Sequence, residues 1–356
     1  MAPERMRQHV RYLTTPDGVH LGWAESGSGP ALIKPATWLT HLEYDWESPV
    51  WRHWIRFLSG NYRYIRYDER GCGMTDWRAA DLAPGHWVRD LESVVEKAAP
   101  AGPFVLLGIS QGAATAIEYA VRHPERISHL VLYGGFARGA ARRGNPEAER
   151  FNEALAEIIL HGWASDEPTM RQVFTSRFIP EASAEQVGWF NELCRRTTSP
   201  QIAAEFMRNH ARIDVSHLLP KLRCSTLVIH ADRDKVVPLA EGRLLASEIP
   251  EARFVEVHSR NHILQESEPA WREFQSLLLE FTGLGSASAA ALQGLSPRER
   301  EILALIAQGL SNAEVAARLG ISEKTVRNQL TRLFEKLGVS SRTQAVALAH
   351  QGGFAA

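Results

Sequence analysis

Residues 105–116 read VLLGISQGAATA, a run that begins as a buried strand and ends as the start of a helix. Ser110 lies at the corner between the two, flanked by Gly108 and Gly112 in a G-x-S-x-G pattern. Glycines at these positions permit a tight turn and close packing of helix on strand, and the turn lifts the serine clear of the strand ends. The stretch therefore predicts a strand–turn–helix unit that presents Ser110 as a nucleophile.

The segments around this unit alternate between strand-like and helix-like patterns. Residues 10–15 and 19–25 flank a Pro-Asp-Gly turn and predict a hairpin. Further strands are predicted at 31–36, 62–68, 104–109, 129–135, 225–231 and 252–257. Helices are predicted at 51–59, 111–124 and 268–283. Alternation of this kind predicts an α/β fold with a mainly parallel sheet and helices on both of its faces.

Residues from about 137 to 220 interrupt this alternation, because the strand signal disappears and the segment becomes helical and polar with scattered aromatic side chains. A helical segment inserted between two strands is typical of a cap over the strand ends. A run of small, uncharged residues at 284–294 predicts a linker. The chain therefore divides into a large domain at 1–283, this linker and a short helical domain at 295–356.

Two segments after the cap supply the partners that a serine nucleophile needs. The run LVIHADRDKVVP, 227–238, places Asp232 and Asp234 directly after a buried strand, and SRNHILQE, 259–266, places His262 in a loop before the last helix of the large domain. The order serine, acid, histidine is the one found on sheets of this kind. An imidazole so placed can act as general base for Ser110 while a carboxylate orients its other nitrogen.

The large domain resembles the α/β-hydrolase family over about residues 10–283. The matching motifs are YDERGCGMTD at 67–76, GISQG at 108–112, HADRDKVVP at 230–238 and the final histidine. The resemblance implies the α/β-hydrolase fold with a helical cap. It also implies a catalytic triad of Ser110, Asp234 and His262, and Asp232 stays open as the rival for the acid.

The loop after the strand predicted at 31–36 is the second part of this site. The resemblance implies an oxyanion hole made by the backbone N–H groups of Gln111 and Trp38. The family usually has His-Gly in this loop, whereas Thr37 takes the place of the glycine here, which leaves catalytic competence open. Tryptophans near the cap predict an aromatic-walled pocket for a small, apolar or ester-like ligand. The expected pocket residues are Trp38, Ser110, Trp163 and His262.

Capping residues mark four helices in the last domain. Their expected N-caps are Ser296, Ser311, Ser322 and Ser341, and glycines at 309, 320 and 338 end the helices that precede them. Only a short turn at Gly320–Ile321 joins the second helix to the third. This is the helix-turn-helix arrangement, in which the second of the two helices enters the major groove of DNA.

The third of these helices has an apolar face and a polar face. Val326, Leu330, Leu333 and Leu337 recur at helical spacing and are expected in the core. The opposite face offers basic and amide side chains that can reach phosphates and base edges. Residues 292–356 hold eight Lys and Arg and five Asp and Glu, a net charge of +3, whereas the 32 basic and 36 acidic residues before them give −4.

The run from LSPREREIL to SSRTQAV, residues 295–346, closely resembles the LuxR-type DNA-binding domain over nearly its whole length. The resemblance implies an all-α four-helix domain that binds double-stranded DNA as a homodimer, with residues 342–350 at the dimer contact. Thr325, Val326 and Lys336 match functional positions of the family, and Gln329 stands where the family often has histidine. The expected DNA-binding residues are Lys324, Thr325, Arg327, Asn328, Arg332 and Lys336.

Composition excludes several other classes of protein. The net charge of −1 rules out binding of nucleic acid through overall charge. Cys72, Cys194 and Cys224 are widely spaced and odd in number, which argues against a disulfide framework or a zinc site and favours a reducing compartment. No signal peptide or membrane span is predicted, so we expect a cytoplasmic protein. No motif for a metal or a cofactor is found, so we expect neither.

Three functions fit these observations. The first is a transcriptional regulator whose α/β-hydrolase domain senses a small ligand next to Ser110. The second is a working esterase-like serine hydrolase that turns over its ligand and regulates transcription through the fused domain. The third is a hydrolase whose last helices serve only for dimerisation, which the exposed basic residues of the third helix disfavour.

Overall fold

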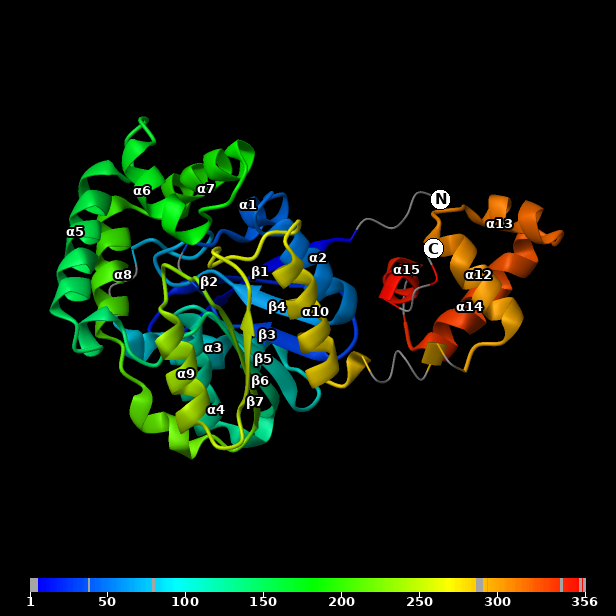
Figure 1. The fold of residues 1–356 in the computed structure, drawn as a ribbon, viewed down its shortest axis with the longest axis horizontal. Coiled ribbons are helices and arrows are strands. Elements are labelled where there is room, and N and C mark those ends of the chain that lie inside the picture. The colour runs from blue at the N-terminus through cyan, green and yellow to red at the C-terminus, as the bar shows by residue number, and fades with distance from the viewer. Residues whose placement is uncertain are drawn as a thin grey trace.

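The computed structural model describes residues 6–37, 39–78, 81–285, 291–292, 294–339, 342–351 and 354. Its elements form two groups (Figure 1). A sheet covered by helices accounts for the described residues up to 285, and four helices account for those after 294.

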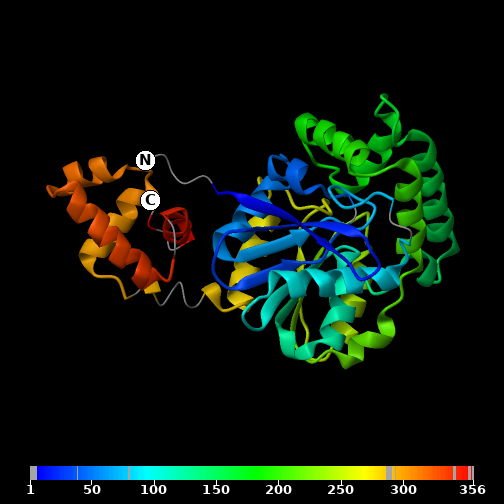
Figure 2. The ribbon, with the colours of Figure 1, turned by 180° about the vertical axis from the view of Figure 1, so that it is seen from behind.

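The sheet has eight strands in the order β1-β2-β4-β3-β5-β6-β7-β8. Its bounds are β1 Gln8–Thr14, β2 His20–Ser26, β3 Ala31–Lys34, β4 Arg63–Tyr67, β5 Phe104–Ile109, β6 Ile127–Tyr133, β7 Ser225–Ala231 and β8 Arg253–Val257. Strand β2 runs antiparallel to both of its neighbours, and all other pairs are parallel. The predicted hairpin is confirmed, with Thr14 opposite His20. Figure 2 shows this hairpin, in dark blue, at the edge nearest the viewer.

Helices cover both faces of the sheet, as predicted. Helices α2 (Arg52–Asn61) and α10 (Pro269–Phe281) pack aromatic side chains against one face, with the rings of Trp54 and Trp271 4.6 Å apart. Helices α3 (Pro84–Ala98), α4 (Gly112–Arg122) and α9 (Leu239–Glu248) cover the other face with aliphatic side chains. The parallel strands between them are buried on both sides, which explains the near-continuous apolar runs in their sequences.

Helices alone form the segment between β6 and β7. Their bounds are α5 Pro146–Gly162, α6 Thr169–Phe178, α7 Ala184–Thr197 and α8 Pro200–Arg212. Figure 1 shows them, in green, gathered at one end of the sheet domain. Asn145, Ser183 and Ser199 cap three of these helices with side-chain oxygens that accept backbone N–H groups. The shorter elements of the domain are α1 Leu42–Trp46 and the 3-10 turns Pro124–Arg126, Ala140–Arg142 and Ser216–Lys221.

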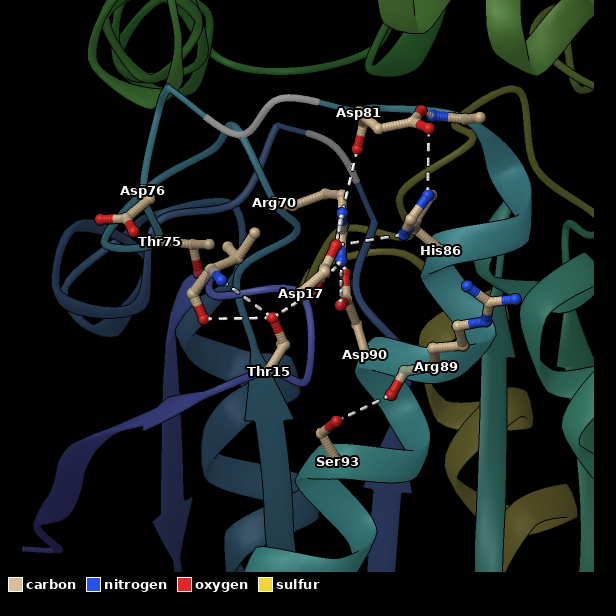
Figure 3. Close-up of polar contacts among 12 residues, drawn as sticks. Thr15, Asp17, Arg70, Thr75, Asp76, Asp81, His86, Arg89, Asp90 and Ser93 are labelled. Carbon is tan, nitrogen blue, oxygen red and sulfur yellow. Dashed lines mark hydrogen bonds and ion pairs between the residues drawn. The ribbon is translucent and has the colours of Figure 1, made fainter.

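A buried arginine ties the loop after β4 to two other parts of the domain (Figure 3). Arg70 has 1% of its side chain exposed and donates to both carboxylate oxygens of Asp90 on α3, at 2.7 and 2.6 Å. It also donates to Asp17, in the β1–β2 turn, at 2.9 Å. Hydrogen bonding to Arg70 holds the pKa of the Asp17 carboxyl well below its ordinary value. Arg70 therefore has a structural role, because it joins three segments far apart in the chain.

Replacing Arg70→Met is expected to lower the free energy of unfolding of the large domain by about 3–5 kcal/mol, because it leaves the buried Asp90 carboxylate without its counter-ion. All ten tryptophans precede residue 285, so their fluorescence during urea unfolding reports on this domain alone. The control Arg89→Met removes an exposed arginine from α3 and should change stability by less than about 0.5 kcal/mol. Equal effects of the two variants would contradict the assigned role.

The four helices of the small domain are α12 Pro297–Ala307, α13 Asn312–Leu319, α14 Glu323–Leu337 and α15 Arg342–Gln351. Capping boxes at Ser296 and Ser311 begin the first two, and the Ser322 side chain caps the third. Gly320 and Gly338 end helices in the left-handed conformation, at φ 65° and 67°. The apolar face of α14 enters the core as expected, and Ser341 lies outside the described residues.

The ends of the predicted linker 284–294 pack into the two domains. Leu284 contacts the core of the large domain, and Leu292 is buried in the core of the small one. The three cysteines are free thiols. Within the described parts of the chain, no helix has the length and apolar character needed to cross a membrane.

Candidate active site and DNA-binding surface

Ser110 occupies a strained turn between β5 and α4. Its φ of 53° lies in the left-handed region that side chains other than glycine rarely adopt. A Cβ on Gly108 would lie 2.7 Å from the Ala113 Cα, which excludes a side chain there without a backbone shift, and one on Gly112 would make a tight contact of 3.1 Å with the Ala36 oxygen. The Ser110 N–H donates to the carbonyl of Tyr133 on β6 at 3.0 Å. These contacts fix the serine at the carboxyl end of the parallel strands.

His262 and Asp234 form a buried pair. Nδ1 of His262 lies 2.6 Å from Oδ2 of Asp234, and each side chain is about 1% exposed. The other carboxylate oxygen accepts the N–H groups of Val236 and Val237 at 2.7 and 3.0 Å. Burial alone would raise the pKa of Asp234, but the charge and the hydrogen bond of His262 bring it below the ordinary value. The carboxylate is therefore ionised and oriented toward the imidazole.

Asp232, the alternative candidate for the triad acid, forms a separate set of hydrogen bonds. One oxygen pairs with Nδ1 of the exposed His258 at 2.8 Å, and the other accepts the N–H of Ser259 at 3.1 Å. Within the described residues its side chain makes no hydrogen bond to His262. The structure joins His262 to Asp234 and leaves Asp232 at the surface.

The cap and β6 hold the imidazole of His262 in place. Its backbone N–H donates to the carbonyl of Phe178, the last residue of α6, at 2.8 Å. The Phe178 ring meets the imidazole edge-on at 5.4 Å. Gly134 has a φ of 55°, and a Cβ on it would lie 3.1 Å from Cε1 of His262, so glycine allows this approach without strain. Sequence analysis did not single out Phe178 or Gly134, although the Gly-Gly pair after β6 was a signal for close packing.

Ser110 and His262 face the same small cavity. It has a volume of about 20 Å³, and Thr37, Gln111 and Phe178 also line it. This volume admits about one water molecule. Nε2 of His262 is buried and has no hydrogen-bond partner among the described residues. A general base needs such a free nitrogen on the side of the nucleophile.

Of the two predicted oxyanion donors, the structure describes Gln111. No acceptor takes the backbone N–H of Gln111 among the residues that the structure covers, so this group is free to bind an oxyanion. The Gln111 side chain lies apart from it, 3.4 Å from Glu69. Trp38, the second expected donor and a predicted pocket residue, lies outside the described residues. The buried Thr37 lines the small cavity directly before it.

A larger cavity of about 180 Å³ extends from Ser110 and Gln111 under the cap. Phenylalanines provide its aromatic wall, namely Phe136, Phe151, Phe174 and Phe178. Trp163, predicted for this wall, is 1% exposed and does not line either cavity. It packs edge-on against Phe174 at 5.6 Å and so lies one layer further into the cap.

Three cations that sequence analysis missed also line the larger cavity: Arg143, Arg177 and Lys235. Lys235 directly follows Asp234, the predicted triad acid, in the motif DKVVP, which was a signal that could have found it. Among the described residues, no group of three or more His, Cys, Asp or Glu side chains could hold a metal ion.

The predicted DNA-binding residues share the outer face of α14. Lys324, Arg327, Asn328, Arg332 and Lys336 are exposed and Thr325 is half-buried. Two of the cations have intramolecular partners, because Nζ of Lys336 lies 2.8 Å from Glu299 and Arg327 lies 3.7 Å from Glu323. No ion pair is formed by Lys324 or Arg332 within the described part of the domain. The face is therefore basic and open to solvent.

Comparison with protein families gives two matches. The family described as "Serine aminopeptidase, S33" matches residues 54–265, and "Bacterial regulatory proteins, luxR family" matches residues 293–349. The first range contains Ser110, Asp234 and His262, and the second contains the whole of α14.

Individual relatives match different shares of the chain. Pyrrolizixenacetamide deacetylase of Xenorhabdus hominickii is 24% identical over 266 residues, 72% of this chain and 91% of the deacetylase. The transcriptional regulatory protein LiaR of Bacillus subtilis is 33% identical over 133 residues, 37% of this chain and 62% of LiaR. The DNA-binding transcriptional activator DevR/DosR of Mycobacterium tuberculosis is 47% identical over 58 residues, 16% of this chain and 27% of that protein. The chain thus spans less than two thirds of either regulator.

Solved structures resemble the large domain in fold. An esterase from Exiguobacterium antarcticum superposes with a TM-score of 0.65 at 22% identity, covering 77% of this chain and all of the esterase. A bromoperoxidase from Bacillus anthracis gives a TM-score of 0.65 at 18% identity, again over 77% of this chain and all of the other. At these identities the likeness is one of fold alone.

Proposed function

Because the chain belongs to the serine aminopeptidase S33 family, with an α/β-hydrolase domain, and ends in a LuxR-type DNA-binding domain, we propose that it is a ligand-sensing transcriptional regulator. In this proposal the hydrolase domain binds a small molecule under the cap, in the cytoplasm, and the small domain binds an operator. Ligand sensing and DNA binding are thereby carried out by different parts of one chain.

The observation that carries the proposal is the cavity of about 180 Å³ that connects Ser110 with the cap. A ligand in it would contact the nucleophile turn on one side and Leu155 of α5 and Phe174 of α6 on the other. Binding can shift an equilibrium only when the ligand contacts the two states differently. A ligand that bridges the sheet domain and the cap meets this condition, because movement of the cap changes its contacts on that side.

We further propose that the chain binds DNA as a homodimer through α14, with α15 at the dimer contact. Two recognition helices must lie roughly 34–36 Å apart to enter successive half-sites on one side of the duplex. A ligand-dependent change in the dimer would alter this spacing and therefore the affinity for the operator.

DNA binding by the full-length chain is expected to weaken steeply between about 50 and about 200 mM salt, because exposed cations release phosphate counterions. Replacing Lys324→Gln should reduce the magnitude of the slope of log affinity against log salt by about 1. Lys221→Gln, an exposed lysine of the large domain, is the control and should leave the slope unchanged. The measurement is fluorescence anisotropy of a labelled duplex of random sequence. Absence of salt-dependent binding to the duplex would favour the alternative in which the last helices serve only for dimerisation.

A second candidate function, hydrolysis of the bound ligand, is favoured by one specific observation. His262 and Ser110 line the same small cavity, Nε2 of His262 has no hydrogen-bond partner among the described residues, and Asp234 holds Nδ1. In the proposed reaction Nε2 takes the Ser110 proton as the serine oxygen attacks a carbonyl carbon, and the Gln111 N–H stabilises the oxyanion. The proton then passes from Nε2 to the leaving group, and water releases the acyl group by the same steps.

A further inference from the structure

The charge of the larger cavity is one-sided. Arg143, Arg177 and Lys235 line it, and none of its lining residues is an Asp or a Glu. Burial lowers the pKa of the lining His210 to about 3, so this histidine is neutral and adds no charge. Three cationic residues therefore line the cavity, and most of its other lining side chains are apolar.

Arg177 is held in position but has no counter-ion. Its guanidinium lies over the Phe151 ring at 4.8 Å and donates one hydrogen bond, to the backbone carbonyl of Lys235. No carboxylate lies within ion-pair distance of Arg177 or of the Lys235 ammonium among the described residues. A guanidinium has five N–H donors, so most of those on Arg177 stay available. Leaving a half-buried cation unpaired is costly unless an anion joins it.

Two acids act on the charge of Arg143, Glu241 and Asp234, and Asp234 is already paired with His262. Glu241 lies 3.8 Å from Arg143 but 2.9 Å from Arg138, so its charge is already used. Arg143 also lies over the ring of Phe136 at 5.3 Å. Burial lowers the pKa of both Arg143 and Arg177 from their ordinary values, which shows that neighbouring acids do not compensate the loss of hydration.

Two of these cations are next in sequence to residues that form the proposed triad or hold it in place. Arg177 precedes Phe178, whose carbonyl holds the backbone of His262, and Lys235 follows Asp234. An anion bound by this pair is therefore fixed relative to the imidazole and the serine. The cavity volume of about 180 Å³ exceeds the roughly 150 Å³ that holds a benzene ring. The occupant must be small, with an apolar body.

We propose that the cavity binds small carboxylates, with the carboxylate at Arg177 and Lys235, the apolar body against the phenylalanines and the other end at Ser110. This inference rests on the proposed function and gives the ligand of that same site a chemical class. It departs from the apolar or ester-like ligand expected from sequence, because a carboxylate must also be present. If the chain hydrolyses its ligand, the substrate is an ester, amide or lactone that bears a separate carboxylate.

Binding of phenylacetate and of phenylacetamide to the full-length Ser110→Ala variant tests the proposal by calorimetry. The two probes have the same shape and differ in charge, and loss of Ser110 prevents hydrolysis of the amide. Phenylacetate is expected to bind at least about tenfold more tightly, as one charge-assisted contact predicts. Equal affinities, tighter binding of the amide, or no binding of either probe would overturn the proposal.

Variants in the same background locate the anion. Arg177→Gln and, separately, Lys235→Gln should each remove most of the preference for phenylacetate. Arg142→Gln, an exposed arginine that does not line the cavity, should keep it. Lys235 is itself exposed, so its variant gives a result even if Arg177→Gln fails to fold. Retention of the preference in both cavity variants would place the anion elsewhere and overturn the assignment.

Ester hydrolysis by the wild-type chain separates this inference from the hydrolase candidate. We expect 4-nitrophenyl hemisuccinate, which carries a free carboxylate, to have a higher kcat/KM than neutral 4-nitrophenyl butyrate. A preference for phenylacetate without hydrolysis of either ester would support the inference and reject the hydrolase candidate. Hydrolysis with preference for the neutral ester would support the hydrolase candidate and overturn the inference.

Discussion

A fluorophosphonate probe is expected to form one covalent adduct with the full-length chain, on Ser110, and intact-mass analysis with peptide mapping will detect it. The probe reacts with a serine whose proton is accepted by a neighbouring base. The free Nε2 of His262 and the ionised Asp234 provide this arrangement in the structure. Ser110→Ala should give no adduct, and His262→Ala should slow labelling by at least about 10³-fold.

Matched variants distinguish this reaction from general reactivity. His258→Ala removes a histidine that also pairs with an aspartate, Asp232, but lies exposed. Ser93→Ala removes a half-buried serine of α3. Both variants should label at the rate of the wild type. Absence of an adduct on the wild-type chain would reject the hydrolase candidate and leave a domain that binds its ligand unchanged.

The same adduct tests whether a ligand bound in the large domain changes the affinity of the small domain for DNA. A probe attached to Ser110 occupies the cavity under the cap, so a coupled sensor should change its affinity for DNA by about fivefold or more when labelled. A sensor that does not need catalysis should also keep its DNA response to a non-covalent ligand in the Ser110→Ala variant. Loss of that response would show that the acyl-enzyme is part of the signal.

The sequence was sufficient to predict a local structure where a motif reflects a steric or conformational requirement. The turn at Ser110 favours glycine at positions 108 and 112, because a Cβ on Gly108 would lie 2.7 Å from Ala113 of helix α4 and one on Gly112 would lie 3.1 Å from the Ala36 oxygen. The helix ends at Gly320 and Gly338 need a left-handed residue, which glycine provides without strain. Such positions are visible in sequence because few alternatives fit the local geometry.

Sequence was insufficient where the outcome depends on which face of a helix is turned inward. Trp163 and Phe174 both belong to the cap, but only Phe174 reaches the cavity, and composition does not distinguish them. The cations at Arg177 and Lys235 come together from α6 and the loop after β7, which only the tertiary fold places side by side. Helix α3 had no predicted counterpart, although Pro84 stands at its first turn, a position that proline favours.

Asp234→Asn is expected to lower kcat/KM for an activated ester such as 4-nitrophenyl butyrate by about 10⁴-fold. An amide at this position can present its NH₂ group to Nδ1 of His262, which stabilises the tautomer that carries the proton on Nε2. Nε2 then cannot accept the proton of Ser110. The amide also cannot stabilise the imidazolium that forms during attack. The same loss should appear in the rate of fluorophosphonate labelling, which needs no knowledge of the substrate.

Asp232→Asn is the decisive control, because it makes the same chemical change two residues away. Asp232 pairs with the exposed His258 and accepts the Ser259 N–H, so its loss should alter the loop at the surface and leave the rate within a few-fold of wild type. Urea unfolding of both variants separates lost chemistry from lost folding. The low pKa of Asp234 means that it is already ionised at neutral pH, so its contribution should persist at alkaline pH and fade only in acid. A larger loss in Asp232→Asn than in Asp234→Asn would assign the acid to Asp232, against the 2.6 Å contact that the structure places on Asp234.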